Sequence, residues 1–375
     1  MNDREFHDLL RGWLIDEAPR EAPDWIVETV IGQTAALPQP RSIPFWRRWR
    51  LPAMRTLAVA LAAVALVGLY TYRLRPADPT EADAPRVVRT AALGPGVALG
   101  MAALPDGVWV GNNSLVGVLR LDPETGETVA SVKTYDRPAP RLDLHPAISD
   151  VTAAFGSIWT VDPEFGTVTR IDPDTNQVVA TIEVGSYPSS AAEAAGALWV
   201  VSALHGTVSR IDPTTDRVTA TAELPVADAD EANLAGDQRA LWIAIGNELV
   251  RVDPRSLDVV ARVGLAGIAD GIAIDRGVWV ATGTRGAVSR IDPESNRIEA
   301  TIEIGTTPSA VTAANGWIWV TDRRDGQVRA IDPSTGELVL SLPTGRGSTA
   351  MAFSGSWLSV LNQIDASVTL IDIGQ

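Results

Sequence analysis

The sequence predicts an all-β fold, a seven-bladed β-propeller of four-stranded blades, preceded by one transmembrane helix and a short helical cytoplasmic segment. The first observation is an aspartate that recurs at spacings of 50, 40, 41, 39, 40 and 40 residues. A fixed period near 40 residues is typical of repeat architectures, propellers among them. The aspartates are Asp122, Asp172, Asp212, Asp253, Asp292, Asp332 and Asp372.

The second observation is a tryptophan at a fixed place in the period. It precedes the aspartate by thirteen residues in five units and by eleven in the fourth, where it is Trp242, while Ser359 replaces it in the last unit. Each period also holds four short β-branched runs separated by Gly, Pro and Asp, in the sixth unit 309–314, 317–322, 327–332 and 338–342. Four antiparallel strands per 40 residues is the composition of a propeller blade.

An Asp-Pro turn follows the third strand of most units. Proline fixes φ at the second turn position and the aspartate carboxylate accepts backbone N–H bonds, so we expect the seven aspartates to be structural rather than catalytic. The residue that needs φ > 0 is Gly, Asn or Asp in five units. Leu257 breaks this rule, which predicts a different hairpin there.

Ring closure is also encoded. The last unit stops after its third strand, at TLIDIGQ, and VVRTAALG at 87–94 matches VVATIEVG at 178–185. We therefore expect the N-terminal strand to complete the last blade and cover its unpaired edge.

Units such as GTVTRIDPDTNQVVATIEVG and GAVSRIDPESNRIEATIEIG resemble the YVTN-type (YncE-like) β-propeller repeat over about residues 87–375. The G-x-x-W-V variant is also similar to the propeller of streptogramin lyases. The resemblance implies a propeller fold but little about function, because one fold carries many sites.

A 17-residue run without charge, 56–72, is long enough to span a bilayer as a helix. Five arginines lie in the flanking stretch 41–55 before it and two in 73–75 after it, so the positive-inside rule places the N-terminus in the cytoplasm and the propeller outside. The domains expected are a cytoplasmic helical segment 1–53, a transmembrane helix 54–73, a linker 74–86 and the propeller 87–375. A cleaved signal peptide ending near Ala84 is the competing interpretation, although an n-region of about 55 residues is far too long for one.

The excess of acidic side chains in the predicted outer domain limits the classes of ligand that it could bind. Residues 76–375 carry 38 acidic and 21 basic side chains, which argues against nucleic acid and for solubility or a small cationic ligand. The chain has no cysteine, so disulfides and thiolate metal sites are excluded.

The cytoplasmic segment shows two apolar stripes of helical spacing, one around Trp13 and one after Asp24. This layout resembles membrane anti-sigma factors in outline, but their zinc-binding His and Cys motif is absent. Residues 1–53 could contact a cytoplasmic partner or form a membrane-proximal tail without a regulatory role.

The candidate ligand site is the mouth of the propeller channel. Asp150, Ser190, Asp230 and Asp270 occupy equivalent inner-strand positions, and Glu231 adjoins Asp230. Mutual repulsion among these acids is expected to raise at least one carboxyl pKa until a cation binds. No cofactor is expected, apart from a divalent cation that oxygen ligands at the channel mouth could hold. The alternative is a hydrated channel that is merely polar.

A ten-residue surplus between the first two units, spread over 132–147, carries Tyr135, Arg137, Arg141 and His145. A loop from an outer strand to the next inner strand crosses the channel face, so this segment is either a ligand-contacting lid or a tolerated insertion.

These features favour a membrane-anchored extracytoplasmic propeller in the cell envelope, acting as a non-catalytic binding, sensing or scaffold module for a small ligand or an envelope protein. The alternative is a metal-dependent propeller lyase or hydrolase using channel-face residues. Streptogramin lyases need a set of His and Glu residues around a metal, whereas the propeller here has only His145 and His205. No catalytic residue is therefore assigned.

Overall fold

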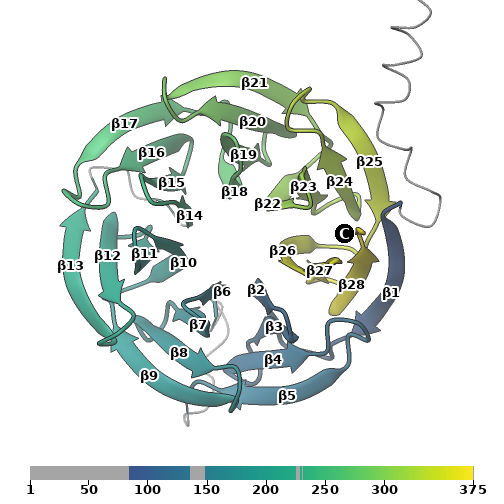
Figure 1. Ribbon diagram of the computed structural model, residues 1–375, viewed down its shortest axis with the longest axis horizontal. Coiled ribbons are helices and arrows are strands. Elements are labelled where there is room, and N and C mark those ends of the chain that lie inside the picture. Colours follow the sequence, from purple (N-terminus) through teal and green to yellow (C-terminus); the bar gives the residue numbers. More distant parts are fainter. Residues whose placement is uncertain (1–83, 136–147, 225–228, 230, 375) are drawn as a thin grey trace, which may run out of the picture. The chain divides into compact units, whose positions relative to one another are not determined.

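The computed structural model describes residues 84–135, 148–224, 229 and 231–374. These residues form seven four-stranded antiparallel sheets arranged around one axis (Figure 1). The predicted seven-bladed propeller is confirmed. The predicted cytoplasmic segment and transmembrane helix lie outside the described residues, among which no helix is long and apolar enough to cross a membrane.

Each blade contributes one strand to each of four concentric layers (Figure 1). The innermost strands are β2 (Val97–Leu104), β6 (Asp150–Ala154), β10 (Pro188–Ala194), β14 (Ala232–Gly236), β18 (Ala269–Ile274), β22 (Pro308–Ala314) and β26 (Ser348–Ser354). The second strands are β3 (Gly107–Asn112), β7 (Ser157–Asp162), β11 (Ala197–Ser202), β15 (Leu241–Ile245), β19 (Val278–Thr282), β23 (Trp317–Asp322) and β27 (Trp357–Asn362).

The third strands are β4 (Gly117–Leu121), β8 (Thr167–Asp172), β12 (Thr207–Asp212), β16 (Glu248–Val252), β20 (Ala287–Asp292), β24 (Gln327–Ile331) and β28 (Ser367–Asp372). The outer strands are β5 (Thr128–Lys133), β9 (Gln177–Glu183), β13 (Arg217–Glu223), β17 (Val259–Gly264), β21 (Arg297–Glu303), β25 (Leu338–Pro343) and β1 (Arg86–Ala92).

The closure scheme is confirmed by β1, which pairs antiparallel with β28 from Arg86 opposite Asp372 to Ala92 opposite Ser367. In Figure 1 the blue β1 lies outside the yellow β28 and completes blade seven. The two ends of the repeat region thus share one sheet, and β28 has no unpaired edge.

The hydrophobic core lies between adjacent blades. The tryptophan of blade one, Trp109, is fully buried and packs in one cluster with Ile158 and Ile171 of blade two. Side chains of the second and third strands dominate these clusters, and both faces of the second strands are buried, as the uniform burial of β3, β7 and β11 shows. Each blade therefore stabilises its neighbour by apolar burial.

The Asp-Pro turns behave as expected. Asp122 Oδ1 accepts hydrogen bonds from the backbone N–H and the hydroxyl of Thr125, at 2.8 and 3.0 Å, and from the N–H of Glu124 at 3.0 Å. These bonds lower the pKa of the Asp122 carboxyl.

The prediction of a different hairpin at Leu257 is wrong. Leu257 adopts φ +66°, and its N–H bonds the Asp253 carbonyl oxygen as in the other turns. The turn therefore keeps its form with a side chain that disfavours the left-handed region, at an expected cost of about 1–2 kcal/mol. The neighbouring blade compensates, because Leu257 packs against the apolar cluster between blades three and four.

Candidate functional site

The inner strands surround a cavity of about 730 Å³ at the channel. Its wall is built at the ends where the inner strands begin, together with the loops that join second to third strands. These strands approach closely, since a Cβ on Gly271 would collide with the carbonyl oxygen of Ser309 in the next blade. The cavity falls within the size range of small-molecule sites.

Four of the predicted residues line this cavity: Asp150, Ser190, Asp270 and Glu231. Asp230 lies outside the described residues. The sequence therefore identified the innermost layer of the fold, which lies around the propeller axis. The predicted equivalence of the four positions is wrong in blades four and five. Asp150 and Ser190 pair with Val161 and Val201, two residues after the tryptophan of their blades, whereas Gly271 and Asn233 hold that place opposite Ala281 and Ala244.

Asp150 joins blade two to blade three by hydrogen bonds. Its Oδ2 accepts the Ser190 hydroxyl and the Ala191 N–H of blade three, both at 2.9 Å. Ser190 is buried and in turn accepts the Leu234 N–H of blade four at 3.4 Å. Removal from water raises the pKa of Asp150, and the bonds from Ala191 and Ser190 oppose that rise.

Asp270 also lines the cavity, but its carboxylate accepts fewer hydrogen bonds than that of Asp150. Its Oδ2 accepts the Gly283 N–H at 2.8 Å, and Arg323 of blade six lies 3.9 Å from Oδ1. The side chain is 20% exposed, and burial raises its pKa against the lowering effects of the Gly283 bond and the Arg323 charge. The rise in pKa was predicted, but its cause is desolvation and not the mutual repulsion of carboxylates.

Of the four residues predicted to form a lid, the structure describes only Tyr135. Tyr135 stacks on Phe165 with ring centroids 4.0 Å apart, and its hydroxyl hydrogen-bonds the Thr167 hydroxyl. It is not among the residues that line the cavity. Arg137, Arg141 and His145 lie outside the described residues.

Sequence reasoning missed a second group of lining residues, on the loops between second and third strands. Pro163, Arg323 and Gln363 each directly follow the second strand of their blade and line the cavity. A signal for them exists in the sequence, because these positions are also equivalent in the repeat. The predicted site drew on the innermost strands alone.

The donor set gives no metal centre in the described part of the chain, where no group of three or more His, Asp or Glu side chains is placed to hold an ion. Asp150 and Asp270 instead accept hydrogen bonds from N–H and O–H groups of the protein. The divalent cation at the channel mouth stays a prediction.

Asp162, at the end of β7, is a further acid that the sequence did not single out. It is fully buried, and its Oδ2 accepts the hydroxyls of Thr160 and Thr169 at 3.2 and 3.4 Å. Its Oδ1 has no partner among the described residues. Desolvation raises the pKa of Asp162 to about 7, although both hydroxyls lower it.

Several solved structures resemble this chain in fold. A virginiamycin B lyase from Staphylococcus aureus aligns with a TM-score of 0.64 at 16% identity, over 77% of this chain and 99% of that one. A streptogramin B lyase aligns with a TM-score of 0.60 at 14% identity, over 76% and 96%. The hydrazine synthase of Kuenenia stuttgartiensis aligns with a TM-score of 0.60 at 15% identity, over 79% and 97%.

No family model matches the sequence, and no curated protein matches it either. Identities of 14–16% show a common fold and do not carry an activity. The chain is a seven-bladed β-propeller similar in structure to streptogramin B lyases.

Proposed function

We propose that this protein is a membrane-anchored extracytoplasmic binding module that takes a small organic cation at the channel mouth and does not transform it. The observation that carries the proposal is the cavity of about 730 Å³ with Asp270 in its wall. A largely buried carboxylate with a single distant arginine gains most from a ligand that supplies a donated N–H and a positive charge.

The charge and shape of the wall support the same ligand class. Among the described lining residues three are acidic, and Arg323 is the one base. The wall also includes large apolar side chains, among them Met101, Leu204, Ile272 and Met351. A ligand with an ammonium group and a compact apolar body satisfies both features.

Binding can be measured on the full-length chain by calorimetry, with phenethylamine as probe and 2-phenylethanol as its neutral isostere. Phenethylamine should bind saturably and raise the melting temperature, and the Asp270→Asn variant should weaken binding at least about tenfold by removing the charge. Glu124→Gln, which removes an exposed acid from an outer turn, is the matched control and should bind as the wild type does. Equal affinities for the amine and the alcohol would contradict the proposal.

The alternative is a metal-dependent lyase or hydrolase, and the names of two structural neighbours make it testable. Incubating the protein with virginiamycin B and Mg²⁺ should leave the compound intact, because no group of three or more His, Asp or Glu side chains among the described residues is placed to hold a metal ion. Conversion of that compound would replace the binding proposal with the catalytic one.

The membrane anchor is a separate part of the proposal and rests on the uncharged run 56–72 with its arginine asymmetry. Protease added to intact spheroplasts is expected to degrade the propeller and spare residues 1–50. Mass spectrometry of the protected fragment provides the measurement. A soluble mature form beginning near Pro85 would show instead that the N-terminal segment is a cleaved signal.

A further inference from the structure

An arginine on the third strand links each of several blades to the next. The position two residues before the turn aspartate is arginine in five blades: Arg120, Arg170, Arg210, Arg251 and Arg290. In four of them the guanidinium lies 5.2–5.5 Å from the ring centroid of its own blade's tryptophan. The same four donate from Nη1 to the proline carbonyl of the next blade's Asp-Pro turn, at 2.6–3.0 Å.

Arg210 departs from this pattern. Among the described residues it neither stacks on the tryptophan of its blade nor bonds the next turn, and it donates to the Thr219 hydroxyl of its own blade at 3.2 Å. Three of the other arginines find a second acceptor in the side chain of Asn176, Asp216 or Asn296. The equivalent residue opposite Arg210 is Leu257, which has no side-chain oxygen.

The missing side-chain oxygen is not the only difference at this turn, because leucine is also bulkier than the residues at the other turns. Arg290 also faces a turn without a side-chain oxygen, since Gly336 stands there, yet it reaches the Pro333 carbonyl at 3.0 Å. Glycine leaves that approach open, whereas leucine places a branched side chain beside it. The missing link thus coincides with the one turn of these five that carries a leucine.

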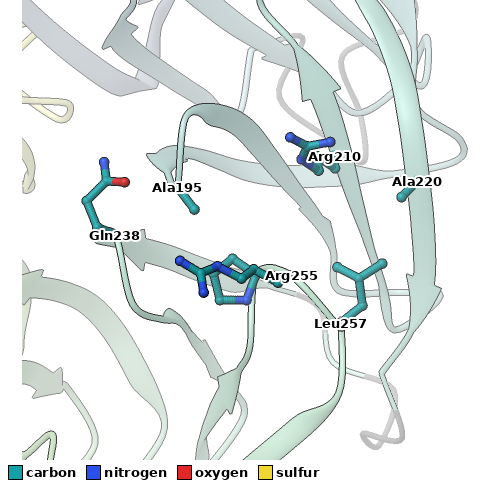
Figure 2. A pocket seen from close by; sticks show the side chains of 7 residues that line it. Ala195, Arg210, Ala220, Gln238, Arg255 and Leu257 are labelled. Atoms are coloured by element: carbon teal, nitrogen blue, oxygen red, sulfur yellow. The ribbon is translucent and has the colours of Figure 1, made fainter.

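A pocket of about 350 Å³ occupies the place of the missing link (Figure 2). Its lining comes from blades three and four: Ala195, Arg210, Ala220, Gln238, Pro254, Arg255 and Leu257. Arg210 and Arg255 lie on its two sides, and Gln238 stands at one end (Figure 2). The backbone N–H of Arg255 bonds Asp253 Oδ1 at 2.7 Å, while its guanidinium forms no hydrogen bond or salt bridge with a described residue.

A second departure from the repeat builds the same pocket. Residues 237–240 join β14 to β15, whereas only 195 and 196 join the corresponding strands β10 and β11. This longer hairpin carries Gln238 and is held in shape by Asp237, whose Oδ1 accepts the N–H groups of Arg239 and Ala240 at 2.7 and 2.9 Å. The Asp237 carbonyl also accepts the Ala195 N–H of blade three at 3.2 Å.

We propose that this pocket binds a small organic oxoanion, a carboxylate or a phosphate monoester. Guanidinium groups match the paired oxygens of such anions, and the Gln238 amide adds a donor. The aliphatic surfaces of Ala195, Ala220 and Leu257 accommodate a short carbon skeleton. The pocket lies at the end of the strands where inner and second strands connect, opposite the end that forms the cavity with Asp270, so it is independent of the cation site.

The experiment is calorimetry of the full-length chain with succinate, acetate and inorganic phosphate, each at constant ionic strength. Succinate or phosphate is expected to bind saturably with a stoichiometry of one, and Arg210→Gln and Arg255→Gln should each weaken that binding at least about tenfold. A response to succinate alone assigns the carboxylate class, and a response to phosphate alone assigns the phosphate class.

Leu257→Asn is the decisive variant. Asparagine tolerates the positive φ at this position, and it restores the side-chain oxygen that Asn176, Asp216 and Asn296 offer to the arginine of the preceding blade. Arg210 should then return to the turn of blade four and fill the pocket. We therefore expect a higher melting temperature and binding of succinate or phosphate weakened at least about tenfold.

Arg239→Gln is the matched control, because Arg239 lies on the same hairpin but pairs with Glu294 at the surface, 3.3 Å away. It should leave the affinity unchanged. The proposal is overturned if no probe binds saturably, if Arg239→Gln weakens binding as much as Arg210→Gln does, or if Leu257→Asn folds with a higher melting temperature and keeps its full affinity.

Discussion

Deleting residues 76–94 is expected to lower the free energy of unfolding by several kcal/mol and to make the protein aggregate. The deletion removes β1 and exposes the full edge of β28. It also removes Leu93, which is buried in the cluster shared by blades seven and one, and its N–H bond to the Ala366 carbonyl at 2.8 Å. The ring then loses both a strand and the contact that closes it.

Urea denaturation and light scattering measure the two effects. Deletion of 76–83 is the matched control, because it shortens the chain before β1 and leaves the strand from Arg86 to Ala92 in place. The control should unfold as the wild type does. An unchanged denaturation midpoint in the longer deletion would show that blade seven does not depend on β1.

Replacing Asp162 with asparagine is expected to stabilise the protein by about 4 kcal/mol at pH 8 and by little at pH 4. The folded pKa of Asp162, about 7, lies above the unfolded value, so the folded state binds more protons between about pH 4 and pH 7. The contribution of Asp162 to the free energy of unfolding therefore falls as pH rises through this window. Asparagine is neutral throughout and removes this contribution to the pH dependence.

The chain contains a precedent for this substitution. Asn362 occupies the equivalent position of blade seven, and its Nδ2 donates to the Ser367 and Thr369 hydroxyls at 3.1 and 2.9 Å. The hydroxyls of Thr167 and Thr169 stand at the same places in blade two. Denaturation midpoints across about pH 4–8 provide the measurement.

Asp322→Asn is the control at the same strand position. Burial raises the pKa of Asp322, but the N–H groups of Thr307, Asp325, Arg324 and Thr306 outweigh it and lower that pKa to about 2. The folded pKa lies below the unfolded value, so this carboxylate stabilises the fold above about pH 4 and the substitution should destabilise it at pH 8. Parallel responses of the two variants would contradict the assignment of opposite environments.

The candidate site was only partly readable from the sequence. Alignment of the repeats placed Asp150 and Asp270 in one layer, because a residue's position in the period fixes its distance from the axis. It did not show that Asp150 accepts two hydrogen bonds from the next blade, whereas Asp270 accepts one from its own blade. That difference depends on which N–H and O–H groups, from other strands and from the neighbouring blade, reach each carboxylate.

The sequence by itself determined the number of blades, the four strands of each, the Asp-Pro turns and the closing strand, because these depend on local turn chemistry and on a hydrophobic pattern repeated in every unit. Only the tertiary structure decided the electrostatic character of equivalent residues. Asp162 and Asp322 end the same strand of their blades, yet one pKa is raised and the other lowered. The physical reason is that a pKa is set by burial and by hydrogen bonds from other segments, and these vary from one blade interface to the next.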